Sequence, residues 1–263
     1  GADYFLHDKE TNKILFMGKN DPGFIEKIDM EKTPDFMMAT DNPDVYLAIF
    51  TPENEKKSKM PQKGQLIIFD IAKGRTEDPV ELGYAPFRWV YSNDRRNFFI
   101  SYKPTPDAAS LELLHYNITE RTTEKLGDLA NEINQLILSK DETKLYALVP
   151  GIKKKKEPGK ILVLNSSPLT LLNTIPVNVT PDALFVIGSE RLVIIDADIR
   201  IWKKPGALRI INSSDYSIIE EKEFPPPYNI YNYFNPNTDT LITIASLPAS
   251  QKSYIYKISP YDL

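Results

Sequence analysis

The sequence contains no cysteine, and its only histidines are His7 and His115. Without cysteine, disulfides, thiolate zinc sites and cysteine nucleophiles are excluded. Two histidines are too few for most histidine-rich metal sites, and any catalytic histidine would have to be one of them. No stretch resembles a nucleotide-binding loop, a zinc signature or a nucleophile elbow. The sequence therefore predicts no metal site and no cofactor, and it identifies no catalytic residue.

Long apolar runs are missing as well. No stretch approaches the roughly 18 consecutive apolar residues that a membrane-spanning helix requires, so we expect no membrane span. The first ten residues, GADYFLHDKE, do not show a basic segment followed by an apolar one. Because the chain starts with Gly1 rather than Met, we expect that a signal peptide, a tag or another upstream region has been removed. The start of the chain leaves the location weakly determined, and we expect an extracytoplasmic one, in the cell envelope or secreted.

A repeated unit accounts for most of the chain. Hydrophobic residues make up 41% and aromatic residues 11% of the 263 residues, which is typical of a folded globular protein. The stretch LSKDETKLYALVP (138–150) consists of an apolar strand, a polar turn and a second apolar strand. The same pattern recurs at 36–50, 89–102, 184–196 and 233–245. The anchors that we take as equivalent are Tyr46, Phe99, Tyr146, Val193 and Ile242, at steps of 53, 47, 47 and 49 residues.

Each hairpin is followed by a third strand and, in most units, by a fourth. Four antiparallel strands in roughly 40 to 50 residues are typical of a β-propeller blade, with a β-sandwich as the weaker alternative. We therefore predict an all-β fold, a β-propeller of about five, or of six or more, four-stranded blades. Residues 1–263 would form a single propeller domain, either alone or as part of a longer chain. Residues 1–34 are either the last two strands of one blade or the first hairpin of an incomplete sixth blade.

The repeats resemble those of the YVTN-type propeller superfamily, which includes lactonase-like and surface-layer propellers. The resemblance rests on the third-strand pieces FLHDKETNK and IIFDIAKGR and on the hairpins TDNPDVYLA and SKDETKLYA. The sequence departs from the family pattern because four of its five hairpins lack the turn glycine. The resemblance implies a propeller fold. A lactonase-like activity would need Glu, Arg and His side chains in the channel, and no motif here matches them.

Basic residues gather in the loops that we expect between the second and third strands. Segments 51–63, 103–109, 150–159, 197–205 and 247–252 contain thirteen lysines and arginines but five acids, in a chain with a net charge of −4. If these loops share one face, that face attracts anionic partners. Alternatively, the lysines only keep the turns solvated. The candidate ligand-binding residues are Lys57, Lys154, Lys155, Arg200, Trp202 and Lys203.

Two functional hypotheses follow. The first is a noncatalytic binding or scaffolding module with a basic face for an anionic partner, either a protein or an anionic glycan. Nucleic acid is disfavoured because the net charge is negative and aromatic residues do not alternate with the lysine runs. The alternative is a lactonase-like or other hydrolytic propeller that acts on a small carbohydrate-derived substrate. The oligomeric state stays open.

Overall fold

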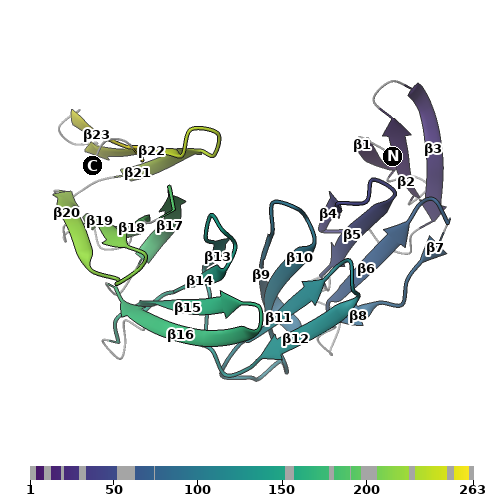
Figure 1. Cartoon of the computed structure of the whole chain (residues 1–263), viewed down its shortest axis with the longest axis horizontal. Coiled ribbons are helices and arrows are strands. Elements are labelled where there is room, and N and C mark those ends of the chain that lie inside the picture. The colour runs from purple at the N-terminus through teal and green to yellow at the C-terminus, as the bar shows by residue number, and fades with distance from the viewer. Residues whose placement is uncertain are drawn as a thin grey trace. The chain divides into compact units, whose positions relative to one another are not determined.

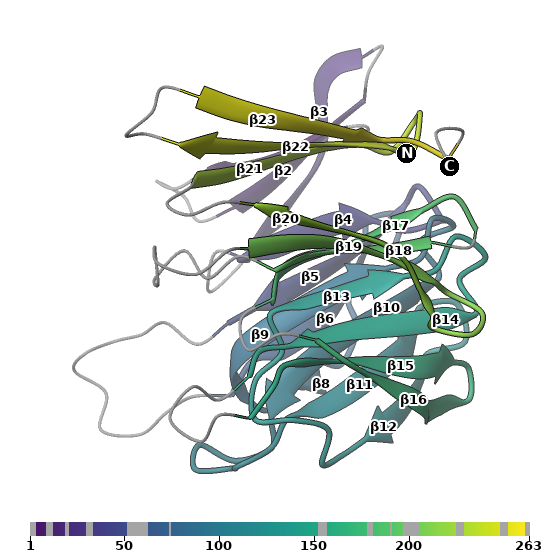
Figure 2. The same cartoon turned by 90° about the vertical axis from the view of Figure 1, so that its left-hand side faces the viewer.

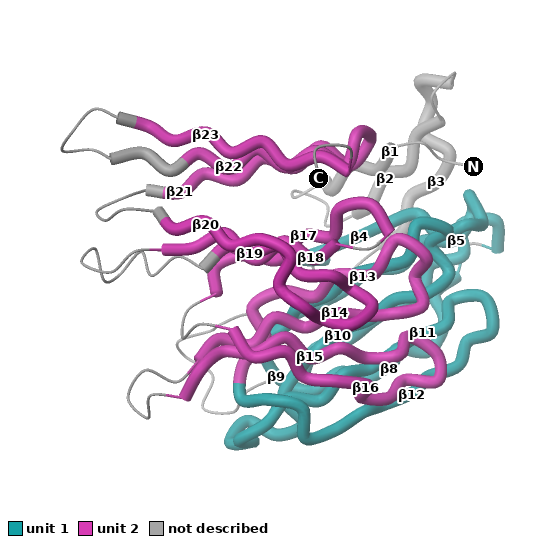
Figure 3. The backbone as a smooth tube through the Cα atoms, turned by 60° about the vertical axis from the view of Figure 1, so that its left-hand side comes forward, with its two compact units in different colours: residues 1–131 teal, residues 132–263 magenta. Residues whose placement is uncertain are grey.

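The computed structural model describes the chain as β-strands joined by turns and loops (Figure 1). None of the described residues belongs to a helix that could cross a membrane. The chain divides into two compact units, residues 1–131 and 132–263, which Figure 3 colours separately. The described ranges are 4–8, 13–18, 21–29, 34–51, 63–73, 75–151, 157–177, 181–189, 191–196, 206–224, 229–247 and 252–260.

Unit 1 contains three antiparallel sheets. The first has the order β1-β2-β3, the second β4-β5-β6-β7 with β8 also paired to β6, and the third β9-β10-β11-β12. The strands are β1 (Tyr4–Asp8), β2 (Lys13–Gly18), β3 (Asp21–Asp29), β4 (Phe36–Ala39), β5 (Val45–Phe50), β6 (Gln65–Asp70), β7 (Arg75–Thr76), β8 (Val80–Glu81), β9 (Tyr84–Tyr91), β10 (Asn97–Lys103), β11 (Glu112–Asn117) and β12 (Thr122–Leu126).

Unit 2 also contains three antiparallel sheets, in the orders β13-β14-β15-β16, β17-β18-β19-β20 and β21-β22-β23 (Figure 2). Consecutive strands pair in every case, so each four-stranded sheet has the up-and-down order of a propeller blade. The strands are β13 (Gln135–Leu138), β14 (Lys144–Val149), β15 (Lys160–Ser166), β16 (Leu169–Pro176), β17 (Pro181–Ile187), β18 (Arg191–Asp196), β19 (Gly206–Asn212), β20 (Ile218–Phe224), β21 (Asn229–Asn235), β22 (Thr240–Leu247) and β23 (Lys252–Ile258).

The described residues thus form six sheets, of which the first and last have three strands. Six sheets agree with the prediction of five or more blades. Residues 1–34 were expected to hold the last two strands of a blade or its first hairpin. They contain three paired strands, β1 to β3, because residues 21–29 add a strand to the second edge of β2. β1 and β2 pair as a hairpin, as in the second form of that expectation, but neither form included β3.

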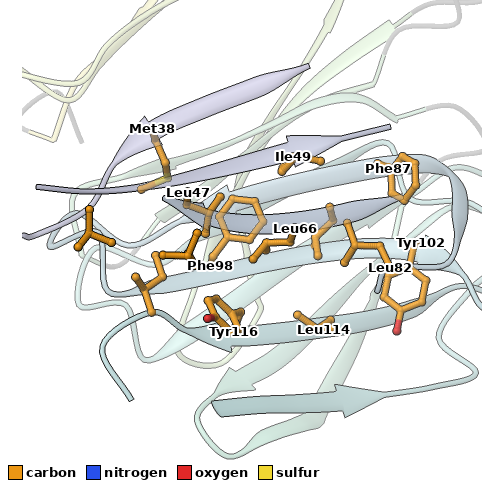
Figure 4. Close-up of a cluster of buried hydrophobic side chains, with 14 residues drawn as sticks. Met38, Leu47, Ile49, Leu66, Leu82, Phe87, Phe98, Tyr102, Leu114 and Tyr116 are labelled. Carbon is orange, nitrogen blue, oxygen red and sulfur yellow. The ribbon is translucent and has the colours of Figure 1, made fainter. Parts of the chain in front are cut away.

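The second strand of the β4–β8 sheet, β5, is apolar throughout. All six residues of β5, VYLAIF, are buried. A strand buried on both faces must lie between other layers of apolar side chains, which explains why its hydrophobic residues do not alternate with polar ones. Figure 4 shows one such layer, in which Leu47 and Ile49 of β5 lie with Phe98 of β10. Ile100 of β10 belongs to the same cluster.

The five predicted anchors all lie on second strands, namely β5, β10, β14, β18 and β22. Tyr46, Phe99, Tyr146 and Val193 are buried, and Ile242 is half-buried. The strand register shows that one anchor, Tyr46, is not equivalent to the other four. In the β9–β12 sheet, Phe99 pairs with His115, which lies two residues before Asn117, the last residue of β11. In the β4–β8 sheet, the residue two positions before the last residue of β6 is Ile68, and it pairs with Leu47.

Tyr46 is therefore one residue out of phase, and its side chain lies on the opposite face of its sheet because side chains alternate along a strand. The error arose because VYLAIF is apolar throughout. In such a strand no alternation in the sequence marks the register.

The hairpin turns use hydroxyl and carboxylate side chains in place of glycine. Ser92 donates to Asp94 Oδ1 at 2.5 Å, and Ser139 donates to Asp141 Oδ1 at 2.6 Å. The next residue in each turn, Arg95 or Glu142, has a φ of about 60°. This is the left-handed conformation that glycine adopts without steric cost, so the turn geometry is kept although the expected glycine is absent.

Candidate functional site

The last sheet exposes apolar side chains on one of its two faces. Its inner face packs against the β17–β20 sheet through Leu241, Ile258 and Phe234. On the outer face Tyr231 and Tyr233 are each 62% exposed, and Ile255 is 69% exposed. The register places Tyr231, Ile244 and Ile255 in one row across the sheet, and Tyr233, Ile242 and Lys257 in the next. We call the outer surface formed by Tyr231, Tyr233, Ile242, Ile244 and Ile255 the tyrosine face.

Equivalent faces of the two preceding sheets are covered. In the β13–β16 sheet, Tyr146 and Val163 belong to a core cluster with residues of β17 and β18. In the β17–β20 sheet, Val193 and Ile210 belong to a cluster with residues of β22 and β23. The tyrosine face has the apolar composition of these inter-sheet surfaces. Within the described part of unit 2 it has no covering layer.

A groove of about 220 Å³ runs beside β23. Leu208, Ile210, Glu220 and Lys222 of β19 and β20 form one wall, and residues Ile255 to Ile258 of β23 form the other. Glu220 and Lys222 pair with each other at 2.9 Å. Burial, together with the nearby Tyr254, raises the pKa of Tyr256 in this wall. The groove is apolar at its base and charged at its rim, so it fits an amphipathic occupant.

His115 occupies a buried position in the β9–β12 sheet. Its ring stacks on Phe99 at 4.6 Å, and Nε2 lies 2.9 Å from Asn97 Oδ1. Nδ1 lies 3.7 Å from Glu124 Oε2. Burial lowers the pKa of His115, although Glu124 opposes the shift. His115 lies on β11, the third strand of its sheet, and the described residues offer no group of three or more His, Asp or Glu side chains that could hold a metal ion.

The six predicted ligand residues lie outside the described residues. Lys57, Lys154, Lys155, Arg200, Trp202 and Lys203 fall in the gaps 52–62, 152–156 and 197–205. The connections themselves are as predicted, because these segments join β5 to β6, β14 to β15 and β18 to β19, each a second strand to a third. Lys63, at the end of the first loop, pairs with Glu81 at 2.7 Å.

No protein-family model matches this sequence, and no curated protein matches it. Solved structures do match. The Dos1 propeller is 9% identical with a TM-score of 0.61, and the match covers 94% of this chain and 63% of that one. The β-propeller domain of the Trilobed protease from Pyrococcus furiosus, described as having an open velcro topology, is 13% identical with a TM-score of 0.55, over 88% of this chain and 71% of that one. The chain has the β-propeller fold.

A third match to the propeller is hydrazine synthase from Kuenenia stuttgartiensis, 10% identical with a TM-score of 0.55, over 90% of this chain and 67% of that one. The propeller thus spans roughly two thirds of the length of these three chains. Identities this low show a common fold and no common activity. The resemblance to the YVTN-type superfamily stays a prediction.

The tyrosine face and the groove were not predicted from the sequence. One signal was available, since the segments YNIYNYF (228–234) and KSYIYKI (252–258) contain five tyrosines between them. Strands with this many tyrosines indicate an aromatic sheet, but the sequence does not show which side chains share a face or whether a layer covers them.

Proposed function

We propose that this propeller is a noncatalytic binding or scaffolding module and that it engages a partner through the tyrosine face. The observation that carries the proposal is the exposure of Tyr231, Tyr233 and Ile255 on one side of one sheet. Large exposed apolar patches on folded proteins mark interaction sites. Tyrosine is also enriched at protein interfaces, since its ring gives a large contact area and its hydroxyl bonds to water or to a partner.

A random peptide library displayed on phage tests the proposal with the full chain as bait. We expect enriched peptides to lose binding to the Tyr231→Ser/Tyr233→Ser double variant. The matched control is Leu171→Ser/Leu172→Ser, which removes two apolar side chains of similar exposure from β16. Equal binding of the enriched peptides to both variants would reject the tyrosine face as the binding surface.

A basic face for an anionic partner is a second candidate. It is supported by the excess of lysine and arginine in the segments that join second to third strands, which leave each sheet at equivalent ends. Binding to an anionic and to a neutral glycan should be compared at two salt concentrations, because salt screens exposed charges over about 8 Å at physiological ionic strength. A Lys57→Glu/Lys154→Glu/Lys203→Glu variant that binds as the wild type does would remove this candidate.

A hydrolytic propeller that acts on a small carbohydrate-derived substrate, lactonase-like or otherwise, is the alternative in a different class. Turnover of a lactone panel by the purified chain would favour it over the binding module. The location that we propose for either activity, extracytoplasmic and either secreted or in the cell envelope, rests on the sequence alone.

A further inference from the structure

One nitrogen atom of His115 is buried without a hydrogen-bond partner among the described residues. The His115 side chain is 6% exposed, and its atom Nδ1 makes no hydrogen bond within this part of the chain. Folded proteins rarely leave a buried polar atom in this state, because the atom has lost its water and gained nothing in exchange. An exception of this kind commonly marks a bound ion, a water molecule or a reactive group.

Neighbouring side chains fix both the ring and its tautomer. The ring stacks on Phe99 with the centroids 4.6 Å apart and an angle of 11° between the planes. Nε2 lies 2.9 Å from Asn97 Oδ1, which can only accept a hydrogen bond, so Nε2 carries the proton. Burial lowers the pKa of His115, so the ring is neutral at pH 7 and Nδ1 has a lone pair. Histidines that bind metals are commonly held in this way, with the second ring nitrogen bonded to an oxygen acceptor.

The lone pair of Nδ1 faces a carboxylate. The register pairs His115 with Glu124 of β12, so the two side chains lie on the same face of neighbouring strands. Glu124 Oε2 is 3.7 Å from Nδ1, which is too long for a hydrogen bond. Glu120, in the turn before β12, adds negative charge near the ring. A cation between Nδ1 and the carboxylate would replace the repulsion of two electron-rich atoms by attraction.

A zinc ion fits the distance between these two atoms. Zinc binds histidine nitrogen and carboxylate oxygen at about 2.0 to 2.2 Å. An ion at such distances from both atoms would span the 3.7 Å with an angle of about 125° at the metal, close to the tetrahedral value. The Glu124 side chain is 43% exposed, so solvent reaches the pair and water can complete the coordination.

We propose that His115 Nδ1 and the Glu124 carboxylate form a site for an exchangeable divalent transition-metal cation such as Zn²⁺, which links β11 to β12. An imidazole nitrogen favours Zn²⁺, Cu²⁺ or Ni²⁺, whereas Mg²⁺ and Ca²⁺ prefer sites made of oxygen atoms. The sequence predicted no metal site because it has only two histidines. That count excludes histidine-rich sites, but it does not exclude a site with one histidine and one carboxylate. This inference goes beyond the binding-module proposal and does not depend on it.

The corresponding rows of the other two four-stranded sheets do not combine these ligands. On β20, Glu220 lies opposite Ile210, and on β16, Asn173 lies opposite Val163. The site therefore comes from the side chains of the β9–β12 sheet and not from the blade architecture. Glu220 also offers a matched control, since it is a glutamate at the position of Glu124 with no histidine opposite.

A zinc titration of the full chain at pH 7, measured by calorimetry, tests the site. We expect one saturable Zn²⁺ per chain, which excess Mg²⁺ does not displace. Glu124→Gln should weaken this binding about tenfold or more, and His115→Gln should abolish it. Glu220→Gln and His7→Gln should bind Zn²⁺ as the wild type does. Because Glu124 is half-exposed, its variant should keep the fold even if the His115 variant does not, and circular dichroism checks both.

Asn97 acts as a positioning residue, because it bonds to the ring nitrogen that does not face the cation. Asn97→Leu removes the acceptor and should weaken Zn²⁺ binding about tenfold. Asn97→Asp keeps an oxygen acceptor at this place and should restore the affinity. A merely structural role for Asn97 would not distinguish the two variants in this order at equal melting temperature.

Nitrogen-15 labelling of the two histidines identifies the ligand atom. At pH 7 without Zn²⁺, Nδ1 of His115 should show the chemical shift of an unprotonated nitrogen. Added Zn²⁺ should move this resonance and leave those of His7 unchanged. Hydrogen exchange of residues 122–126 should slow at the same time, because a ligand that binds only the folded sheet stabilises it.

Three results would overturn the inference. Protonation of both ring nitrogens of His115 at pH 7 would mean that a proton already bridges Nδ1 and Glu124. Absence of saturable binding up to about 1 mM Zn²⁺ would exclude the site. Equal binding by the wild type, Glu124→Gln and His115→Gln would place the ion elsewhere. None of these results bears on the phage-display experiment at Tyr231 and Tyr233, so the two proposals fail separately.

Discussion

The β17–β20 and β21–β23 sheets are built from similar strands but differ in what covers them. Val193 and Ile210 are buried in the first sheet, whereas their equivalents in the second, Ile242 and Lys257, are partly or largely exposed. Within the described part of unit 2, a fourth strand and a further sheet cover the first of these surfaces and neither covers the second, so burial here follows from neighbouring strands and layers.

The largest expected difference in stability is between alanine variants of two tyrosines, one buried and one exposed. Tyr146 is 1% exposed and Tyr233 is 62% exposed. Tyr146→Ala should lower the free energy of unfolding by about 3 to 5 kcal/mol, because it empties a packed core position. Tyr233→Ala should change it by less than about 0.5 kcal/mol. Urea unfolding followed by circular dichroism measures both, and similar losses would show that the tyrosine face is buried in solution.

His115 and Lys257 occupy equivalent third-strand positions, opposite Phe99 and Ile242, but only His115 is buried. Stability should therefore depend on pH through His115. Burial lowers the folded-state pKa of His115 below the ordinary value of 6.5, so the unfolded chain binds a proton more readily. The stabilisation from the neutral ring is complete above that value and is lost as the pH falls below it. His115→Gln should flatten the dependence of the melting temperature on pH between about 7 and 5. Parallel curves for the variant and the wild type would contradict the burial of this ring.

Substitutions at two hairpin-turn residues with the same backbone φ should change the free energy of unfolding by smaller amounts. Arg95 and Gly188 both have a φ of 61°. Arg95→Gly should raise the free energy of unfolding by about 0.5 kcal/mol, because relief of the left-handed strain exceeds the extra entropy of glycine in the unfolded chain. Gly188→Ala should lower it by about 1 kcal/mol for the opposite reason. Thermal melts of the two single variants should shift in opposite directions.

The smallest effect is expected in the loop that joins β14 to β15. Replacing Lys153, Lys154, Lys155 and Lys156 by serine should change the free energy of unfolding by less than about 1 kcal/mol, since exposed charges contribute little each. A matched set of changes in β14 would be severely destabilising. A large fall in melting temperature for the lysine variant would assign these residues a structural role.

Local sequence patterns were sufficient for most of the strands and for their order, although they did not predict β3. Each hairpin such as SKDETKLYA combines two short apolar strands with a turn that Ser139 and Asp141 close by hydrogen bonds, so it is specified by neighbouring residues. The repeat then predicted the third and fourth strands and the propeller fold. The register of β5 could not be read in the same way, because an entirely apolar strand has no polar residue to mark its face.

Only the tertiary structure decided which apolar strands are covered. Tyr146 and Tyr233 lie in similar segments, YALV and YFN, yet one is in a core and the other is exposed. His115 pairs with Phe99 and Lys257 pairs with Ile242, and the equivalence of these two third-strand positions becomes visible only when each strand is paired with its neighbour. The physical reason is that a strand's own residues set its alternation and turns, whereas burial depends on the strands that pair with it and on the layer that packs against it.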